Sequence, residues 1–216
     1  MTGESLFSAP KQRRSRETLD RVLEVATELL QEVGYDEMRV AEVSERANVG
    51  TASIYARVGS KHGLLLAVQA RMVDQLDREA EELLAPLYGF DGSLDALVAA
   101  AVTVVGDLFR RHESLLRVFM IRAGSDQTVT EHGSDSTVRL SDVFAEVLLS
   151  RRDQITHADP ERAVDVCFRM VYDTLARRVL RGAGFESRRE LAWEDLVAEL
   201  AIAAAAYLRH AGSPGS

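Results

Sequence analysis

Apolar residues recur at helical spacing along nearly the whole chain. Between residues 16 and 33 they fall at positions 19, 22, 23, 26, 29, 30 and 33, which is the repeat of one amphipathic helix. Ser15 stands before this stripe as its expected N-cap, and Gly34 follows it as its expected terminator. A longer stripe starts from Ser60, a second expected N-cap, and continues to about residue 84. No segment alternates in the manner of a strand, so the pattern predicts an all-α fold.

Further helices are expected after residue 90, because apolar residues keep the helical repeat between sparse prolines and glycines. They cover residues 93–111, 113–122, 138–151, 160–181 and 191–210, which brings the total to about nine. The polar stretch at residues 124–137 is expected to be a mobile loop. The last two helices are apolar around most of their circumference, so each needs partners on more than one side. They are the expected homodimer interface, and a monomeric bundle with an alanine-rich core helix is the alternative.

Two short helices around a tight turn are predicted between residues 38 and 58. Val40, Val43 and Ala47 share one face of the first helix, and the segment TASIYARV forms the second. Asn48 lies at the break and tolerates the left-handed conformation that such a turn often requires. A pair of this geometry is a helix-turn-helix, in which the second helix enters the major groove of DNA.

The stretch YDEMRVAEVSERANVGTASIYARVGSKHGLL resembles the DNA-binding region of TetR-type regulators. The resemblance covers about residues 16–66. It rests on the amphipathic helix ending at Gly34-Tyr35, the segment VAEVSERANV, Ile54-Tyr55 and the run GSKHGLL. It implies three N-terminal helices that bind DNA and a larger helical domain that binds an effector and dimerises. It also implies a repressor that binds a palindromic operator and leaves it when a small, largely apolar ligand binds.

Several residues depart from the usual TetR pattern. Arg39 stands where a small hydroxyl residue commonly caps the second helix, so this cap is either absent or supplied by Asp36. Asn48 replaces a common glycine, and Arg57-Val58 replaces a frequent His-Phe pair. The sequence GTAS at residues 50–53 removes a cation from the recognition helix. These changes leave the fold prediction intact but make the operator sequence unpredictable.

The expected organisation has four parts. Residues 1–15 form a flexible basic arm, residues 16–60 the helix-turn-helix domain, residues 61–210 a ligand-binding and dimerisation domain, and residues 211–216 a disordered tail. The net charge of −8 argues against a protein that coats nucleic acid over its whole surface. The stretch of residues 11–16 holds four cations and no acid, whereas residues 74–95 are strongly acidic. This asymmetry suits an oriented contact with DNA.

Candidate DNA contacts follow from the polar residues around the recognition helix. Arg57 is the best candidate for reading a base, because a guanidinium can bridge O6 and N7 of guanine. Thr51 and Ser53 suit base edges or phosphate, and Tyr55 suits phosphate. Lys61, near the positive end of the next helix, is the expected phosphate clamp. The remaining candidates are Arg39 for phosphate, and Arg14 and Arg16 for the flanking minor groove or backbone.

The sequence does not identify an effector pocket. His112 has the strongest claim, as a polar group in an apolar neighbourhood, and the other candidates are apolar or amphipathic residues that are more often plain core. A single cysteine and five histidines without metal-ligand spacing predict no metal and no cofactor. No long apolar run is present, which predicts a cytoplasmic protein without a membrane span. The candidate ligand-binding residues are Phe109, His112, Phe119, Met120, Cys167, Phe168, Tyr172 and Trp193.

Two other classes of protein remain open at this point. The run Glu131-His132-Gly133-Ser134-Asp135 brings together acid, base and nucleophile types, but adjacent residues in a polar loop lack a scaffold that holds an activated geometry. A helical adaptor without DNA binding suits the acidic charge and the missing recognition-helix lysine. Turnover of generic esters would favour the enzyme, and stable dimers without affinity for genomic DNA would favour the adaptor.

Overall fold

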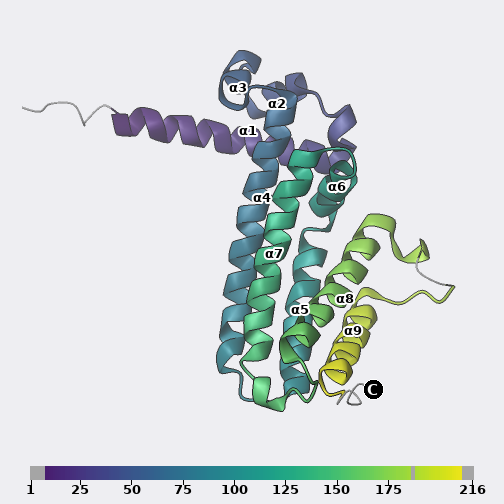
Figure 1. The fold of residues 1–216 in the computed structure, drawn as a ribbon. Helices are drawn as coiled ribbons and strands as arrows, with labels where there is room; N and C mark the ends of the chain where they lie inside the picture. The colour runs from purple at the N-terminus through teal and green to yellow at the C-terminus, as the bar shows by residue number, and fades with distance from the viewer. Residues whose placement is uncertain (1–7, 186–187, 211–216) are drawn as a thin grey trace, which may run out of the picture. The chain divides into compact units, whose positions relative to one another are not determined.

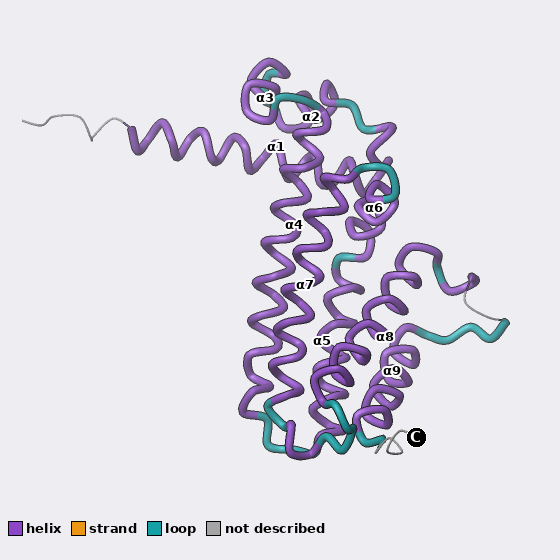
Figure 2. The backbone as a smooth tube through the Cα atoms, viewed as in Figure 1, coloured by secondary structure: helices purple, strands orange, loops and turns teal. Residues whose placement is uncertain are grey.

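The computed structural model describes residues 8–185 and 188–210 (Figure 1). These residues form nine α-helices and three short 3-10 helices. Figure 2 shows helices and loops and no strand among the described residues. The predicted all-α fold with about nine helices is confirmed. The α-helices are α1 (Ser8–Glu37), α2 (Val40–Ala47), α3 (Thr51–Val58), α4 (Lys61–Leu84), α5 (Leu94–Arg111), α6 (Glu113–Ala123), α7 (Gln127–Leu149), α8 (Pro160–Arg181) and α9 (Trp193–Leu208). The 3-10 helices are η1 (Ala85–Gly89), η2 (Arg152–Gln154) and η3 (Ala183–Phe185).

The chain divides into two compact units, Met1–Met72 and Val73–Ser216, and the division falls inside α4. In the first unit α1 packs against α2 and α3, and α2 packs against α3. The core of this unit is aliphatic and includes Ile54 of α3, which is fully buried. The other buried apolar residues of this unit include Val22, Ala26, Leu29, Leu30, Met38, Val40, Val43, Ala47, Val49, Leu64, Leu65 and Val68.

The first helix is longer than the apolar stripe predicts. It begins at Ser8, so Ser15 lies inside the helix and the expectation of an N-cap there is wrong. Proline at position 10 is compatible with this start, because the first turn of a helix has no intrahelical partners for its N–H groups. The expected terminator Gly34 does break the helical geometry, with φ 76° and ψ 177°, and the chain then continues to Glu37. Residues 1–7 of the expected arm and the expected tail at residues 211–216 lie outside the described residues.

The second unit is organised around α5, which packs against α7, α8 and α9. Gly106 of α5 allows a close approach to α9, because a Cβ atom at this position would lie 2.8 Å from Cγ2 of Val197. The α8 helix packs against both α7 and α9. Its buried face carries Cys167, Val171 and Leu175 into the same core as Phe144 of α7. The last two long helices are thus partly covered within one chain.

The expected loop at residues 124–137 is mostly helix, so that prediction is wrong. The helix α7 begins at Gln127, where the Asp126 side chain accepts a hydrogen bond from the Val129 backbone N–H. Val129 is only 1% exposed and anchors this first turn in the unit. Farther along, Ser136 donates to Asp77 of α4, 2.8 Å away. Capping and tertiary contacts therefore stabilise a segment that has too few apolar residues to show a helical stripe.

None of the helices within residues 8–185 and 188–210 combines the length and the apolar content that a membrane span requires.

Candidate nucleic-acid interface

The turn between α2 and α3 has the conformation that its residues suggest. Asn48 adopts φ 52° and ψ 48°, in the left-handed region, and its backbone N–H donates to the Glu45 carbonyl oxygen. The Ser44 hydroxyl donates to the Val49 carbonyl oxygen at 2.7 Å, and the Val49 N–H donates back to the Ser44 carbonyl oxygen at 3.0 Å. These bonds close the turn over a short stretch of backbone and set where α3 starts.

The orientation of α3 follows from a single buried residue. Ile54 is 0% exposed and packs into the first unit, whereas Tyr55 is 42% exposed. The exposed residues of the helix are here termed the outer face of α3: Ala52, Tyr55, Ala56 and Arg57. Thr51 and Ser53 are half-buried at the edge of this face. The recognition helix therefore presents its polar candidates outward while its aliphatic residue holds it in place.

Arg57 is held along the helix by Ser53, one turn earlier. Its Nη1 donates to the Ser53 carbonyl oxygen at 2.8 Å and also to the Ser53 hydroxyl. A guanidinium has five N–H donors, so the Nε and Nη2 edge remains available for a second, bidentate partner. Ser53 therefore orients Arg57, and its own predicted contact with DNA stays a prediction.

The start of α4 is fixed by a tight approach to the end of α3. The Ser60 hydroxyl accepts a hydrogen bond from the Gly63 N–H at 2.9 Å, as expected for an N-cap. A Cβ atom at Gly63 would lie 1.8 Å from the Val58 carbonyl oxygen, so only glycine fits there. Gly59, with φ 75°, supplies the positive backbone angle between the two helices. Within the run GSKHGLL, Gly59, Ser60 and Gly63 are therefore explained by the backbone geometry between α3 and α4.

Lys61 lies at the first position of α4, beside the end of α1. Its Nζ donates to the Asp36 carbonyl oxygen at 3.1 Å and stands 4.6 Å from the centroid of the Tyr35 ring. The ammonium group is therefore held beside the N-terminal end of α4, where the helix dipole adds positive potential. This arrangement suits an anion, although the same contacts also stabilise the corner between α1 and α4.

The other candidate DNA contacts are dispersed over the first unit. Arg39 is the N-cap residue of α2, and no side-chain hydrogen bond caps that helix. Of the two alternatives, a cap that is absent or a cap supplied by Asp36, the structure shows the first. Arg14 and Arg16 are exposed in the N-terminal part of α1. Arg46, which was not a candidate, is engaged by Glu32 at 2.9 Å and Glu42 at 2.7 Å. Among the candidates, the structure joins Ser53 and Arg57 by hydrogen bonds.

In the second unit, Glu79 of α4 gathers three polar partners. Its carboxylate lies 3.0 Å from His112 Nε2 and 2.8 Å from Arg111 Nη1, and it accepts from Gln75 Nε2 at 2.8 Å. Desolvation by burial raises the pKa of Glu79, but the hydrogen bonds from His112, Gln75 and Arg111 outweigh it and hold the pKa at about 2. His112, the polar candidate for an effector contact, is thus engaged at the junction of α5 and α6.

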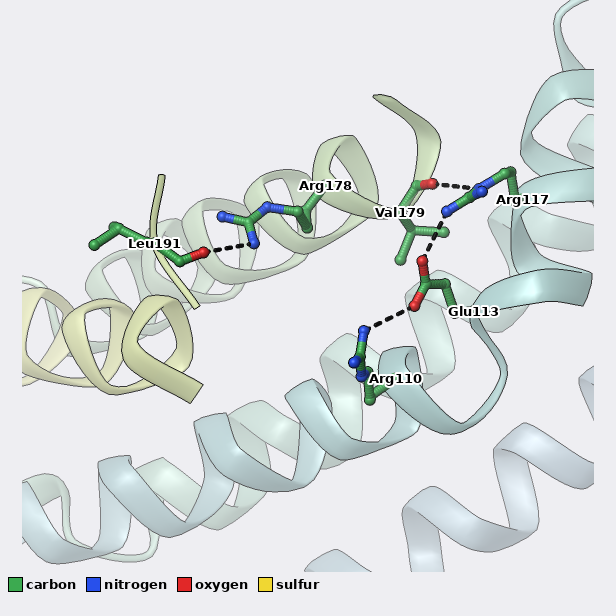
Figure 3. A network of polar contacts seen from close by, with 6 residues as sticks. All are labelled: Arg110, Glu113, Arg117, Arg178, Val179 and Leu191. Atoms are coloured by element: carbon green, nitrogen blue, oxygen red, sulfur yellow. Dashed lines mark hydrogen bonds and ion pairs between the residues drawn. The ribbon is translucent and has the colours of Figure 1, made fainter. Parts of the chain in front are cut away.

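A second polar network connects α6 to the end of α8 (Figure 3). Glu113 accepts from Arg110 at 3.1 Å and from Arg117 at 2.7 Å. Arg117 in turn donates through Nε to the Val179 carbonyl oxygen in the last turn of α8, at 2.7 Å. Carbonyl oxygens there have no partner within the helix, so an arginine from α6 satisfies one of those at the end of α8.

The remaining effector candidates fall into separate places. Phe109, Phe168 and Tyr172 form an aromatic cluster, with ring centroids 5.1 Å apart for Phe109 and Tyr172 and 5.5 Å apart for Phe168 and Tyr172. Sequence reasoning missed Thr137, whose hydroxyl oxygen is 2.7 Å from that of Tyr172, because it treated this part of α7 as a loop. Phe119 and Met120 lie on α6, Cys167 contacts the Ala204 carbonyl oxygen of α9, and Trp193 lies under Arg110.

The residues considered for enzymatic or metal chemistry do not form a constellation. Residues 131–135 are consecutive on α7, where successive side chains point about 100° apart. Glu131 accepts instead from Gln127, one turn earlier. Among the residues that the structure describes, no group of three or more His, Cys, Asp or Glu side chains is placed to hold a metal ion.

The first unit has the architecture of a helix-turn-helix DNA-binding domain, and the second unit is a separate helical domain. Residues 22–68 match the family model of bacterial regulatory proteins of the tetR family, and residues 93–208 match the tetracyclin repressor-like C-terminal domain. The chain therefore belongs to the TetR family of DNA-binding transcriptional regulators, as the resemblance in its sequence implied.

Solved structures show the same fold at low sequence identity. A TetR-family transcriptional regulator from Mesorhizobium loti is 21% identical with a TM-score of 0.66, over 90% of this chain and 95% of that one. Salmonella enterica GusR is 14% identical with a TM-score of 0.65, over 90% and 96%. FadR from Bacillus subtilis, solved in complex with stearoyl-CoA, is 14% identical with a TM-score of 0.62, over 89% and 98%. No curated protein sequence matches the chain significantly.

The left-handed turn gives a direct test of the helix-turn-helix geometry. We expect Asn48→Ala to lower the free energy of unfolding by about 1–2 kcal/mol, because a Cβ-bearing residue without a compensating polar side chain is strained there. Asn48→Gly, the matched control, relieves the strain and is expected to be neutral within about 0.5 kcal/mol. Urea titration followed by circular dichroism measures both, with hydrogen exchange in α2 and α3 locating the change. Equal losses in the two variants would contradict this account of the turn.

The Glu79 cluster predicts a pH dependence of stability with a definite sign. Because the pKa of Glu79 is lowered from 4.5 to about 2, its contribution is complete above pH 4.5 and is lost as the pH falls toward 2. We expect Glu79→Gln to be less stable than the parent protein at pH 6, with a difference that shrinks as the pH falls through this window. Urea titrations at a series of pH values measure it. Glu82→Gln, an exposed change on the same helix, is the control, and a pH-independent difference for Glu79→Gln would refute the assignment.

Proposed function

We propose that the protein is a transcriptional repressor that binds a palindromic operator as a homodimer and is released by a small, largely apolar ligand. The observation that carries the DNA-binding part is the outer face of α3. Its residues are exposed while Ile54 of the same helix is buried, and it bears Arg57, whose guanidinium is oriented by Ser53. A helix held in this way can enter the major groove with a preformed base-reading group, since a helix of this width fits that groove.

The proposed contacts divide by the chemistry of each residue. Arg57 reads a guanine through its free Nε and Nη2 edge, while Tyr55 and Thr51 at the sides of α3 contact phosphate or base edges. Lys61 binds a backbone phosphate at the N-terminal end of α4. Arg39 at the start of α2, with Arg14 and Arg16 in α1, adds contacts outside the major groove.

The homodimer is proposed to form through α8 and α9. The exposed face of α9 is almost free of charge along its C-terminal half, and Ile202 at its centre is 62% exposed in the single chain. Ala198, Ala203 and Ala206 surround it with small side chains that let another helix approach closely. A second copy of the same chain covers such a face by two-fold symmetry, which also matches a palindromic DNA site.

The effector is proposed to bind near the aromatic cluster of Phe109, Phe168 and Tyr172. These rings come from α5 and α8, and the Tyr172 and Thr137 hydroxyls place one polar pair beside them. An apolar ligand with a single polar group suits such surroundings. FadR from Bacillus subtilis, a protein of the same fold, was solved in complex with stearoyl-CoA, of which the acyl chain is apolar and the coenzyme A part is charged.

The first experiment is selection of genomic fragments by the purified protein, followed by footprinting of the enriched fragments at two salt concentrations. We expect a symmetric site whose half-sites are spaced for a two-fold dimer, with affinity that falls steeply with salt. Absence of enrichment over random DNA by folded, ligand-free protein would overturn the proposal and favour the adaptor.

Two variants separate base reading from phosphate binding. We expect Arg57→Ala to weaken operator binding by about 1–3 kcal/mol and to relax sequence preference. We expect Lys61→Ala to weaken binding to all sequences alike and to reduce the slope of the salt dependence by about 1. Arg46→Ala, which removes a cation already paired with Glu32 and Glu42, is the matched control. Equal losses on operator and random DNA for Arg57→Ala would remove that residue from base reading.

A charge at the centre of the α9 face tests the dimer. We expect Ile202→Asp to weaken self-association by at least about tenfold, because an unpaired carboxylate would be buried between the two copies. Sedimentation velocity at several protein concentrations measures the change. Ile121→Asp replaces an equally exposed isoleucine, 63% exposed on α6, and is expected to leave the dimer intact. Unchanged self-association of Ile202→Asp would exclude this face as the interface.

A further inference from the structure

The point of α3 farthest from the core is formed by two alanines. Ala52 and Ala56 each lie two residues from Ile54, which at about 100° per residue puts each roughly 160° around the helix from it. Ile54 is fully buried and both alanines are exposed. The larger exposed residues, Tyr55 and Arg57, stand to either side of this ridge. When α3 enters the major groove with this side inward, the Ala52 and Ala56 methyl groups therefore face the floor of the groove.

A methyl group recognises a different feature of DNA from an arginine or a serine. It offers no hydrogen bond, so it cannot bind the donors and acceptors on base edges. It packs favourably against the 5-methyl group of thymine, which projects into the major groove and distinguishes a T·A pair from a C·G pair. Small side chains at both positions also let the helix backbone approach the floor of the groove, which a long side chain would prevent.

The position of Arg57 makes this contact compatible with guanine reading. Its Nη1 is fastened to the carbonyl oxygen of Ser53, so the guanidinium lies back along the preceding turn of α3 and does not extend from the end of the helix. Ser53 is adjacent to Ala52 in sequence, so the guanidinium is held beside the turn of α3 that carries this alanine. A half-site that contains both a guanine and neighbouring thymines satisfies both groups.

We propose that Ala52 and Ala56 are specificity-determining residues that read thymine methyl groups in each operator half-site, next to the guanine bound by Arg57. This inference rests on the proposed operator binding. It gives sequence preference to a recognition helix that carries no lysine and only one arginine. The partner it requires is duplex DNA whose major groove displays thymine methyls at the position of the ridge.

The test replaces thymine by uracil one position at a time in a selected operator. Uracil keeps the base pair and every hydrogen-bonding group and removes only the methyl. We expect wild-type protein to lose roughly fourfold in affinity at each contacted thymine, since burying one methyl-sized group is worth about that factor. Fluorescence anisotropy with each substituted duplex at fixed salt measures the change.

Variants of the alanines connect the effect to the ridge. In Ala52→Gly and Ala56→Gly the uracil penalty at the corresponding thymine is expected to fall below about twofold, because the protein methyl is gone. Ala41→Gly removes an exposed methyl from α2 of the same unit, and it is expected to retain the full penalty. Each variant is compared with itself on thymine and uracil DNA, so a general loss of stability or affinity cancels from the ratio.

The outcomes separate this inference from the proposed function. Failure to select any operator would overturn the proposed function. Selection of an operator with no thymine position at which uracil weakens wild-type binding would overturn the inference and leave the function standing. A uracil penalty that persists unchanged in both Ala52→Gly and Ala56→Gly would assign the methyl contact to another residue, and would also overturn it.

Discussion

The arrangement of the DNA-binding unit depends on the left-handed turn at Asn48 and on the burial of Ile54 that the turn makes possible. The turn fixes where α3 starts, and the buried isoleucine fixes how the helix is rotated about its own axis. Rotation by one residue, about 100°, would carry Arg57 and the two alanines off the outer face. Gly63 adds a third constraint, because its lack of a Cβ allows α4 to start against the Val58 carbonyl oxygen. A few backbone requirements thus determine which side chains are available to DNA.

The second unit is held together at its helix junctions by arginine and carboxylate groups. Glu79 engages the junction of α5 and α6, and Glu113 and Arg117 connect that junction to the last turn of α8 (Figure 3). The two networks involve neighbouring residues, 111–113, on the short link between α5 and α6. A movement of α6 would therefore disturb contacts on both α4 and α8. Such polar junctions can be rearranged with less loss of buried apolar area than the α5 and α9 contact around Gly106.

The sequence was most informative where local chemistry decides the structure. The apolar stripe, the Ser60 cap and the turn at Asn48 are each determined within a few residues, and all were predicted. The part of α7 around Ser136 and Thr137 was missed because these residues find their partners on α4 and α8, which are distant in the sequence. The contact between Ser53 and Arg57 was missed although the two residues are only one turn apart, because both were treated only as candidate DNA contacts. Ala52 and Ala56 were not predicted to contact DNA, because a methyl group forms no hydrogen bond and its proposed partner is another methyl group, that of thymine.

The single cysteine has a practical consequence for observing this molecule at work. Cys167 is fully buried between α8 and α9, and desolvation raises the pKa of its thiol to about 12. At neutral pH almost none of it is thiolate, the form that reacts with maleimides and iodoacetamides. We therefore expect the native chain not to react with thiol labels. In the proposed homodimer, a surface cysteine placed in each copy would carry a spin label or fluorophore at a known position. Distances between the two DNA-binding units could then be followed as a candidate ligand is added, without first removing a core residue.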